Sequence, residues 1–332
     1  MLHVTSMRVA LEHDMDLLRR GAQAYAVISA WAGAGLFAAL ADGDPRPLES
    51  LPGDLRALAG TAPILVHVGL LVMDPEGRCA LTAAARELLR QGVLSGASAE
   101  SSLGDLSRLD LLLREGGPAR GPDGASRVTE GGVREGDREG ARRFLDMLFR
   151  RSEKTSVEVV RWLAPRLAQG ARVLDLGGGH GRYAHALAGA GFRVELFDRD
   201  LCVDIARERY GDALSYRAGD FMTDDLGGPF DAALLSNIVH GLGEGELAQL
   251  FARLARALAP GGLLVLKDMF LDDHGADPAE AVFFGLQMLM YTRQGQSYPV
   301  HRMRELLGAA GFASPEHIYL RDLRFSLVLA RR

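Results

Sequence analysis

From about residue 142 onward, the sequence alternates short apolar runs with helical stretches. The apolar runs read "ARVLDLGGG", "FRVELFD", "ALSYRAGD", "DAALLSN" and "GGLLVLKD". Helical segments such as 183–190 and 246–258 lie between them. Strands that are joined through helices run parallel, and the helices cover both faces of the sheet. The pattern therefore predicts an α/β fold with an open, parallel sheet.

The C-terminal segment departs from this alternation. It reads "HIYLRDLRFSLVLARR" and contains two apolar runs with only a few residues between them. Such a connection is too short for a crossover helix, so the two strands must pair antiparallel. We expect a mostly parallel sheet that is finished by an antiparallel C-terminal hairpin.

Residues 1 to about 100 are predicted to form a separate, mainly helical part of the chain. The apolar run "LFAAL" is expected to close a first helix before "DGDPRP" breaks it. Two further helices are expected at 53–60 and 63–72. The segment "DPEGRCALT" is typical of a short hairpin with its turn at Pro75 to Gly77. Helices followed by a small hairpin predict a winged-helix domain.

Winged-helix domains often bind DNA through a basic recognition helix. The candidate helix here, "TAPILVHVGLLVM", contains no Lys or Arg, and the whole chain has a formal net charge of -5. No positive field draws such a protein to nucleic acid. We therefore expect no nucleic-acid partner.

The segment from Gly21 to Ala41 carries no charge over its whole length. As a helix it would be long enough to span a hydrocarbon core of ~30 Å. It consists mostly of alanine and glycine and includes Gln23 and Ser29, which makes it weakly apolar. A helix buried at a subunit interface explains the segment better, so we expect a homodimer and no membrane association.

The stretch from Gly116 to Gly140 is rich in glycine and charge and is typical of a loop or connector. The expected organisation is a helical winged-helix domain at 1–100, connecting helices and a Gly-rich loop at 101–150, and an α/β domain at 151–332.

The cysteines and histidines indicate no metal site and no disulfide framework. Only Cys79 and Cys202 are present, and His274, His301 and His317 are scattered without ligand spacing. The N-terminus "MLHVTSMRVALEHDMDLL" carries charges where a signal peptide would be apolar. We expect a cytoplasmic protein.

Three alternating glycines indicate a ligand site at the end of the first strand of the sheet. Gly177, Gly179 and Gly181 follow "RVLDL" and open a helix, where the absence of Cβ atoms lets a ligand approach the backbone. The dinucleotide fingerprint would place glycine or alanine at position 182, but this chain has Arg182. The motif thus predicts a nucleotide-type ligand other than NAD or FAD.

Two carboxylates refine this prediction. Asp175 lies inside the motif, where its charge would repel a pyrophosphate and favour an ammonium or sulfonium group. Asp198, at the end of "VELFD", is placed to accept hydrogen bonds from a ribose diol. Together they predict a cationic nucleoside as the ligand.

The ordered motifs "VLDLGGGHG", "LFD", "AGDFM", "LLSNIVHGL", "LAPGGLLVLKD" and "LLGAAGF" resemble those of class I S-adenosylmethionine-dependent methyltransferases. More narrowly, the chain resembles the plant and bacterial O-methyltransferase family with an N-terminal winged-helix dimerisation domain. The resemblance covers nearly the whole chain. It implies a Rossmann-like sheet, S-adenosylmethionine as methyl donor and a homodimer.

The resemblance also assigns residues to the donor site. The methionine part of the donor is bordered by Asp175, Gly177 and Gly179, and the ribose is held by Asp198. The adenine is flanked by Asp220 and Phe221, and Ser236 belongs to the same site. For Asp220 and Phe221, a helix cap and a core position are open alternatives.

His240 is the candidate catalytic residue. It follows the apolar run "AALLSNIV" and so lies at the carboxyl edge of the sheet, where open α/β folds bind their ligands. The resemblance implies that it takes the proton of a substrate hydroxyl. A phenol of pKa about 10 is a poor nucleophile until deprotonated, and an imidazole of pKa about 6.5 is mostly neutral at pH 7. The alternative is a histidine that only satisfies local hydrogen bonds.

The sequence departs from the family around this residue. The family usually has His-Asp-Trp where this chain has "HGL". Asp268, in "LKDMF", matches one of two acids that orient the histidine, although it could also be only a strand-end residue. The second acid would fall near Gln296 or Ser297, where this chain has no carboxylate.

The segment "FFGLQMLMY" places Phe284, Met288 and Tyr291 on one helical face. Such a stripe is either core or the wall of a site for a flat, apolar substrate. We therefore expect a methyltransferase that acts on a small apolar metabolite, aromatic or polyketide-like, with His240 as the base for O-methylation. The alternatives are methylation of an activated carbon, and a protein that binds the donor without transferring methyl.

Overall fold

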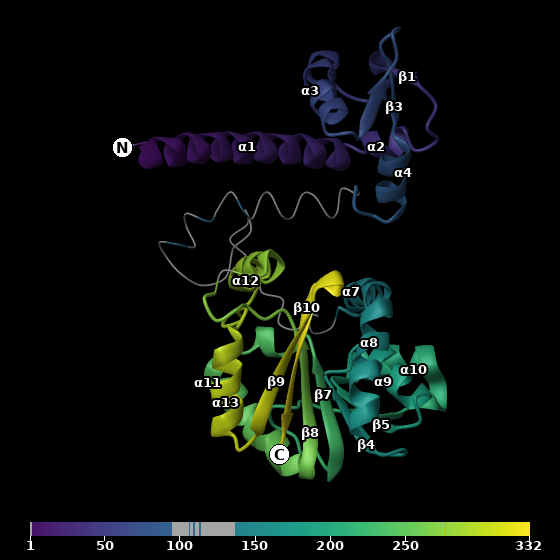
Figure 1. Cartoon of the computed structure of the whole chain (residues 1–332). Helices are drawn as coiled ribbons and strands as arrows, with labels where there is room; N and C mark the ends of the chain where they lie inside the picture. Colours follow the sequence, from purple (N-terminus) through teal and green to yellow (C-terminus); the bar gives the residue numbers. More distant parts are fainter. Residues whose placement is uncertain (1, 95–105, 107–108, 110–112, 114–136, 276) are drawn as a thin grey trace. The chain divides into compact units, whose positions relative to one another are not determined.

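The computed structural model describes residues 2–94, 106, 109, 113, 137–275 and 277–332. The chain divides into two compact units, Met1–Glu115 and Gly116–Arg332 (Figure 1). The helix at 138–151 belongs to the second unit, and the sequence boundaries expected at 100 and 150 stay predictions. Of the predicted connector at 101–150, the part from 101 to 136 lies outside the described residues, except for positions 106, 109 and 113.

The first unit consists of helices around a small antiparallel sheet in the order β1-β3-β2. Its elements are α1 (Leu2–Gly33), α2 (Leu36–Ala39), β1 (Arg46–Pro47), η1 (Leu48–Ser50), α3 (Leu55–His67), β2 (Leu71–Met73), β3 (Arg78–Leu81) and α4 (Ala83–Arg90). The predicted hairpin is confirmed, since β2 pairs with β3 from Leu71 opposite Leu81 to Met73 opposite Cys79.

Two helix predictions in this unit are wrong. The first helix does not continue to residue 40, because Gly35 adopts a φ of +71° and separates α1 from α2. The helices expected at 53–60 and 63–72 are one helix, α3, which contains Pro63. Its buried face continues through that proline, with Leu58, Ala62 and Leu65 all buried. The burial of this face outweighs the loss of one backbone hydrogen bond.

The surface of α1 is more exposed than a helix buried on all sides would be. Leu18 is 67% exposed and Tyr25 is 42% exposed in the isolated chain. Trp31, near its end, is buried and donates through Nε1 to Thr61 Oγ1. Among the described helices, none is both long and apolar enough to cross a bilayer.

The second unit contains a seven-stranded sheet in the order β6-β5-β4-β7-β8-β10-β9. The strands are β4 (Arg172–Leu176), β5 (Arg193–Asp198), β6 (Ser215–Ala218), β7 (Phe230–Ser236), β8 (Leu258–Asp268), β9 (Ala313–Leu320) and β10 (Phe325–Arg331). The first five run parallel, and β10 pairs antiparallel with both β8 and β9. The predicted sheet and its C-terminal hairpin are confirmed.

Helices cover both faces of this sheet (Figure 1). The helical elements are α7 (Arg138–Arg151), α8 (Glu153–Leu163), η3 (Ala164–Arg166), α9 (Arg182–Gly189), α10 (Asp200–Tyr210), η4 (Gly211–Ala213), η5 (Val239–Gly241), α11 (Glu244–Ala257), α12 (Ala279–Tyr291), α13 (Val300–Ala309) and η6 (Arg321–Leu323).

Alternation along the strands divides the core into two layers. Val173 of β4 packs with α8, α9 and α10, whereas its neighbours Leu174 and Leu176 pack with α11 and α13 on the opposite face. Both faces are therefore buried, as the continuous apolar runs of the sequence require. This leaves the carboxyl ends of the parallel strands as the place where polar side chains gather.

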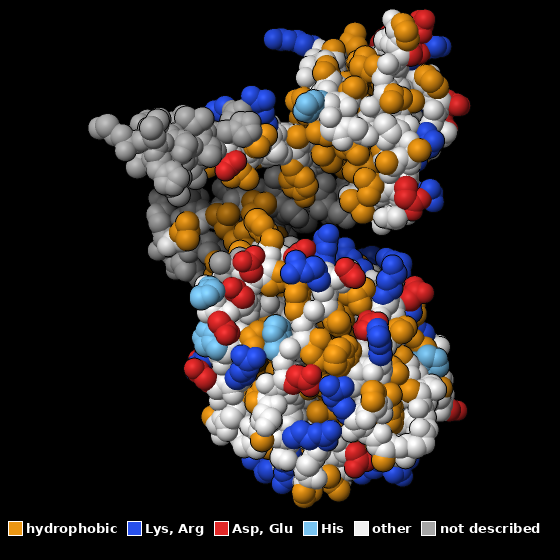
Figure 2. Space-filling view, viewed as in Figure 1, with side chains coloured by type: hydrophobic (Ala, Val, Ile, Leu, Met, Phe, Trp, Pro, Cys, Tyr) orange, Lys and Arg blue, Asp and Glu red, His pale blue; other side chains and the backbone are white. Residues whose placement is uncertain are grey.

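The molecular surface carries charges of both signs. Figure 2 shows Lys and Arg side chains interspersed with Asp and Glu over the visible face of the second unit. On this face no single-sign field dominates.

Candidate active site at the carboxyl edge of the sheet

The glycine motif forms a tight turn between β4 and α9. Gly177, Gly179 and Gly181 have φ values of +70°, +48° and +76°, a region that glycine adopts without strain. The Gly177 N–H donates to the carbonyl of Phe197 on the adjacent strand at 2.8 Å. A Cβ at position 177 would lie 2.3 Å from Cδ1 of Ile238. The dihedral angles of the turn therefore favour glycine, and a side chain at position 177 would also require Ile238 to move.

Asp198 lies directly against this turn. Its Oδ2 accepts the Gly179 N–H at 2.8 Å, and its Oδ1 accepts the Arg199 N–H at 2.7 Å. The residue is only 8% exposed, and burial raises the pKa of its carboxyl above the ordinary value despite these donors. The structure thus brings the predicted ribose-binding residue and the glycine turn together.

Asp175 is a buried carboxyl beneath the same turn. It is 1% exposed, and its Oδ2 has no hydrogen-bond partner among the described residues. Burial, together with the nearby Asp198 carboxylate, raises the pKa of Asp175 to about 7. A buried carboxylate without a cation is unfavourable, so a positively charged ligand at this turn would stabilise its ionised form.

His240, in η5 just beyond β7, and Asp268, at the end of the adjacent strand β8, form a hydrogen-bonded pair. Nδ1 of His240 lies 2.8 Å from Oδ1 and 3.0 Å from Oδ2 of Asp268. Asp268 is 1% exposed; burial opposes its ionisation, but the His240 imidazole and the Lys267 ammonium together hold its pKa below the ordinary value. An ionised Asp268 accepts from Nδ1–H, which leaves Nε2 as the proton-accepting nitrogen of the neutral ring.

The segment predicted to lack the second acid does lie beside His240. The Gln296 N–H donates to the His240 carbonyl at 2.9 Å, and Ser297 Oγ donates to the Ala281 carbonyl at 2.7 Å. These contacts fix the loop without supplying a carboxylate. Asp268 is therefore the carboxylate that pairs with the His240 ring among the described residues.

The face of α12 that carries Phe284 contacts His240. The Phe284 ring meets the His240 ring edge-on, with centroids 4.8 Å apart and an interplanar angle of 87°. Met288 and Tyr291, on the same face of α12, are partly buried. By contrast Phe283, on another face, is 68% exposed. The structure thus places one member of the predicted substrate wall in contact with the candidate base.

The remaining predicted donor residues lie around the turn or between it and His240. Asp220 Oδ1 accepts the Met222 N–H at 2.8 Å, so this residue does cap a local turn. The Phe221 ring is partly buried, packs against the core and lies 3.9 Å from the position that a Cβ on Gly177 would take. Ser236 ends β7 with a buried Oγ that has no hydrogen-bond partner among the described residues. For Asp220 and Phe221, these contacts are compatible with both the ligand role and its structural alternative.

Sequence reasoning missed three features of this site. Leu145 of α7 covers the turn, because a Cβ on Gly179 would lie 3.3 Å from its Cδ2. Ile238 fills the space beside Gly177. Lys267 is a buried lysine whose Nζ donates to Asn237 Oδ1 at 2.7 Å. Of these three residues, only Lys267 could have been noticed in the sequence, because it is a charged residue at the end of an apolar run.

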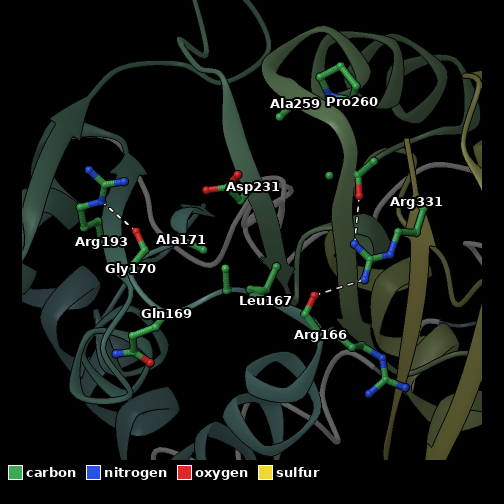
Figure 3. A pocket seen from close by; sticks show the side chains of 13 residues that line it. Arg166, Leu167, Gln169, Gly170, Ala171, Arg193, Asp231, Ala259, Pro260 and Arg331 are labelled. Carbon is green, nitrogen blue, oxygen red and sulfur yellow. Dashed lines mark hydrogen bonds between the residues drawn. The ribbon is translucent and has the colours of Figure 1, made fainter.

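A cavity of about 340 Å³ lies at the opposite, amino edge of the strands (Figure 3). Residues 166–171, which precede β4, form one side of it. Arg193 Nε donates to the Gly170 carbonyl at 2.8 Å, and Arg331 donates to the carbonyls of Gly261 and Arg166. These basic groups are already bonded to backbone, and the cavity lies away from the glycine turn and His240.

Comparisons with known proteins agree with this geometry. Residues 131–313 match the model of the O-methyltransferase domain family. The chain is 31% identical over 173 residues to acetylserotonin O-methyltransferase of Bos taurus, a match that covers 48% of this chain and 47% of the relative. It is 30% identical over 146 residues to the tetracenomycin polyketide synthesis 8-O-methyl transferase of Streptomyces glaucescens, covering 42% and 43%. The matches thus span about half the length of these curated relatives.

Two solved structures show the same fold over nearly the whole chain. The mitomycin 7-O-methyltransferase superposes with a TM-score of 0.78 at 21% identity, covering 99% of both chains. Human N-acetylserotonin methyltransferase, in complex with S-adenosylmethionine, superposes with a TM-score of 0.72 at 20% identity, covering 97% of both chains.

Proposed function

We propose, from the premise that this chain belongs to the O-methyltransferase family, that it transfers the methyl group of S-adenosylmethionine to a hydroxyl of a small apolar metabolite. The observation that carries the proposal is the hydrogen-bonded pair of His240 and Asp268. His240 follows Ile238 by two residues in the sequence, and the Ile238 side chain packs against the glycine turn. A donor site and a proton-accepting site are therefore adjacent.

The donor fits the residues around the turn. When bound, S-adenosylmethionine supplies an electrophilic methyl group on a positively charged sulfur. The Asp175 carboxyl, whose Oδ2 has no hydrogen-bond partner among the described residues, offers the negative charge that a sulfonium or ammonium requires, and the carboxylate of Asp198 offers acceptors for ribose hydroxyls. Phe221 offers an apolar surface for the adenine.

The base fits the chemistry of a hydroxyl acceptor. The acceptor oxygen forms a bond to the methyl carbon while the carbon–sulfur bond breaks and its electron pair stays on sulfur. His240 Nε2 takes the hydroxyl proton, and the Asp268 carboxylate stabilises the imidazolium that results. The protein contributes alignment, exclusion of water and this base.

The acceptor proposed is aromatic or polyketide-like. The Phe284 ring against His240, with Met288 and Tyr291 on the same helix face, offers a flat apolar wall beside the base. Two relatives act, by their names, on acetylserotonin and in tetracenomycin polyketide synthesis, which supports the same class.

Methylation of an activated carbon is the second candidate. It is favoured by the loop at Gln296 and Ser297, which touches His240 through backbone atoms but supplies no second acid. A carbon that is already an enolate or an electron-rich ring position needs less help from a base. This function would retain the same donor site.

We also propose that the protein is a homodimer in the cytoplasm. The exposed apolar side chains of α1, including Leu17, Leu18 and Tyr25, support an interface on this helix. Cys79 and Cys202 are both free and buried, as is usual in a reducing compartment.

The test of the activity is turnover of S-adenosylmethionine with a panel of aromatic and polyketide hydroxyl compounds, read as formation of S-adenosylhomocysteine. The proposal expects acceptor-dependent formation of this product. Binding of the donor without turnover on any member of the panel would favour a protein that binds the donor without transferring methyl.

A further inference from the structure

Lys267 is a buried cation at the carboxyl edge of the sheet. It is 6% exposed, and it is one of only two lysines in a chain whose other basic residues are arginines. Its Nζ donates to Asn237 Oδ1 at 2.7 Å and lies 5.0 Å from the centroid of the Phe325 ring. An ammonium has three N–H donors, and among the described residues Lys267 Nζ makes this one hydrogen bond, so the group is able to bind an anion as well. A buried ammonium gains most from such a partner.

The register of the sheet places Lys267 level with the glycine turn. Lys267 pairs with Ser236, and the preceding residue of β7 pairs with Leu176, which directly precedes Gly177. Lys267 therefore lies at the height of the turn, separated from it by the end of β7 alone. A lysine side chain is long enough to cross one strand.

Strand alternation places Lys267 and Asp175 on the same face of the sheet. Val265, two residues before Lys267, packs in the same core layer as Val173, two residues before Asp175. Asp268 points to the opposite face, where it meets His240. A buried cation and a buried carboxyl, whose Oδ2 has no hydrogen-bond partner among the described residues, thus flank the turn from the same side.

The residues at the end of β7 hold the ammonium there. Asn237 has a left-handed φ of +59°, which asparagine tolerates better than most residues. Its backbone N–H donates to the Lys267 carbonyl at 2.8 Å while its side chain accepts from Nζ. The adjacent Ser236 Oγ is buried without a hydrogen-bond partner among the described residues. One ammonium and one free hydroxyl therefore lie together at the end of the strand.

The charge of Lys267 also reaches the glycine motif. His180, inside the motif, is buried, and burial followed by the charges of Arg209, Arg182 and Lys267 lowers its pKa to about 3. Lys267 is thus electrostatically close to the turn that lies across β7.

We propose that Lys267, with the Ser236 hydroxyl, binds the α-carboxylate of the methionine part of the donor. The amino-acid part of S-adenosylmethionine is a zwitterion, and the site offers a cation for its carboxylate at Lys267 and an acid for its positive groups at Asp175. This inference rests on the proposed function, because it takes S-adenosylmethionine as the donor.

The test compares two ligands that differ only in the carboxylate. Isothermal titration calorimetry measures the binding of S-adenosylmethionine and of decarboxylated S-adenosylmethionine to the full chain and to Lys267→Met. Wild type should bind S-adenosylmethionine roughly tenfold to a hundredfold more tightly than the decarboxylated compound, the size expected for a charge-assisted hydrogen bond. Lys267→Met should bring this ratio close to one. Lys154→Met, which replaces the exposed lysine of α8, should leave the ratio unchanged.

Three outcomes would overturn the inference. Equal affinity of wild type for the two ligands would overturn the inference without any variant. The inference therefore remains testable even if the Lys267→Met protein fails to fold. An equal loss of affinity for both ligands in Lys267→Met would show that Lys267 only supports the turn. Absence of binding of either ligand to wild type would instead remove the proposed function itself, and this inference with it.

Discussion

His240 Nδ1 lies 2.8 Å from Oδ1 of Asp268, where the segment that follows β7 meets the end of the neighbouring strand β8. The pair joins a proton-accepting ring to a buried carboxylate whose pKa lies below its ordinary value. Because the carboxylate holds Nδ1–H, the second ring nitrogen is left to accept a proton. This relationship is the basis for assigning the chemistry to this edge of the sheet.

Removal of the base should affect turnover and spare donor binding. We expect His240→Ala to lower kcat on the order of 10²-fold or more and to leave the donor Kd nearly unchanged. Steady-state kinetics and calorimetry measure these effects, with His274→Ala as an exposed control. A parallel loss of donor affinity would instead place His240 in the donor site.

Removal of the Asp198 carboxylate, which is proposed to bind the ribose, should weaken donor binding. Asp198→Ala is expected to weaken binding of S-adenosylmethionine by about 1–3 kcal/mol, because hydrogen bonds to a charged acceptor are lost. The matched control is Asp200→Ala, which removes an exposed carboxylate two residues away. Unchanged affinity in Asp198→Ala would show that this carboxylate serves only to hold Gly179 and Arg199.

Donor binding should depend on pH through Asp175, whose pKa is about 7 in the free protein. Below this value the carboxyl is mostly protonated and neutral, and above it the carboxyl is mostly ionised and attracts a cationic ligand. Affinity should therefore rise as the pH rises through about 7, and binding at pH 7 should release about half a proton. Calorimetry in two buffers with different ionisation enthalpies measures the release, and Asp175→Asn should abolish it. A wild-type enthalpy that is independent of the buffer would contradict this coupling.

The exposed apolar side of α1 should mediate association. We expect a dimer of the full chain by light scattering without detergent, and a monomer after Leu18→Glu, because a buried unpaired charge is unfavourable at an interface. Leu55→Glu, at a residue of α3 that is 49% exposed, is the control that should stay dimeric. A monomeric wild type would count against this interface.

The sheet was predictable because local signals agree with the global fold. Several strands of the second unit are short apolar runs, such as "RVLDL" in β4 and "FDAALLS" in β7, and the alternating glycines indicated a ligand site after the first of them. The pairing of His240 with Asp268 also follows once β7 and β8 are adjacent, since Asp268 ends β8 and His240 lies in η5, just beyond the end of β7.

Other features depend on contacts that no local pattern encodes. The continuity of α3 through Pro63 depends on the burial of Leu58 and Leu65, and the break before α2 depends on the dihedral angle of Gly35. Lys267 was a visible charge in an apolar strand, but its bond to Asn237 depends on the register between two strands. Long-range packing decided each of these.

The position of the transferred methyl group tests the central proposal most directly. Wild type and His240→Ala are incubated with S-adenosylmethionine that carries a ¹³C-methyl group and with an aromatic hydroxyl acceptor, and the product is examined by NMR. We expect the labelled methyl on oxygen in the wild-type product and almost no labelled product with His240→Ala. A methyl on carbon, or O-methylation that proceeds equally well without His240, would contradict the proposal.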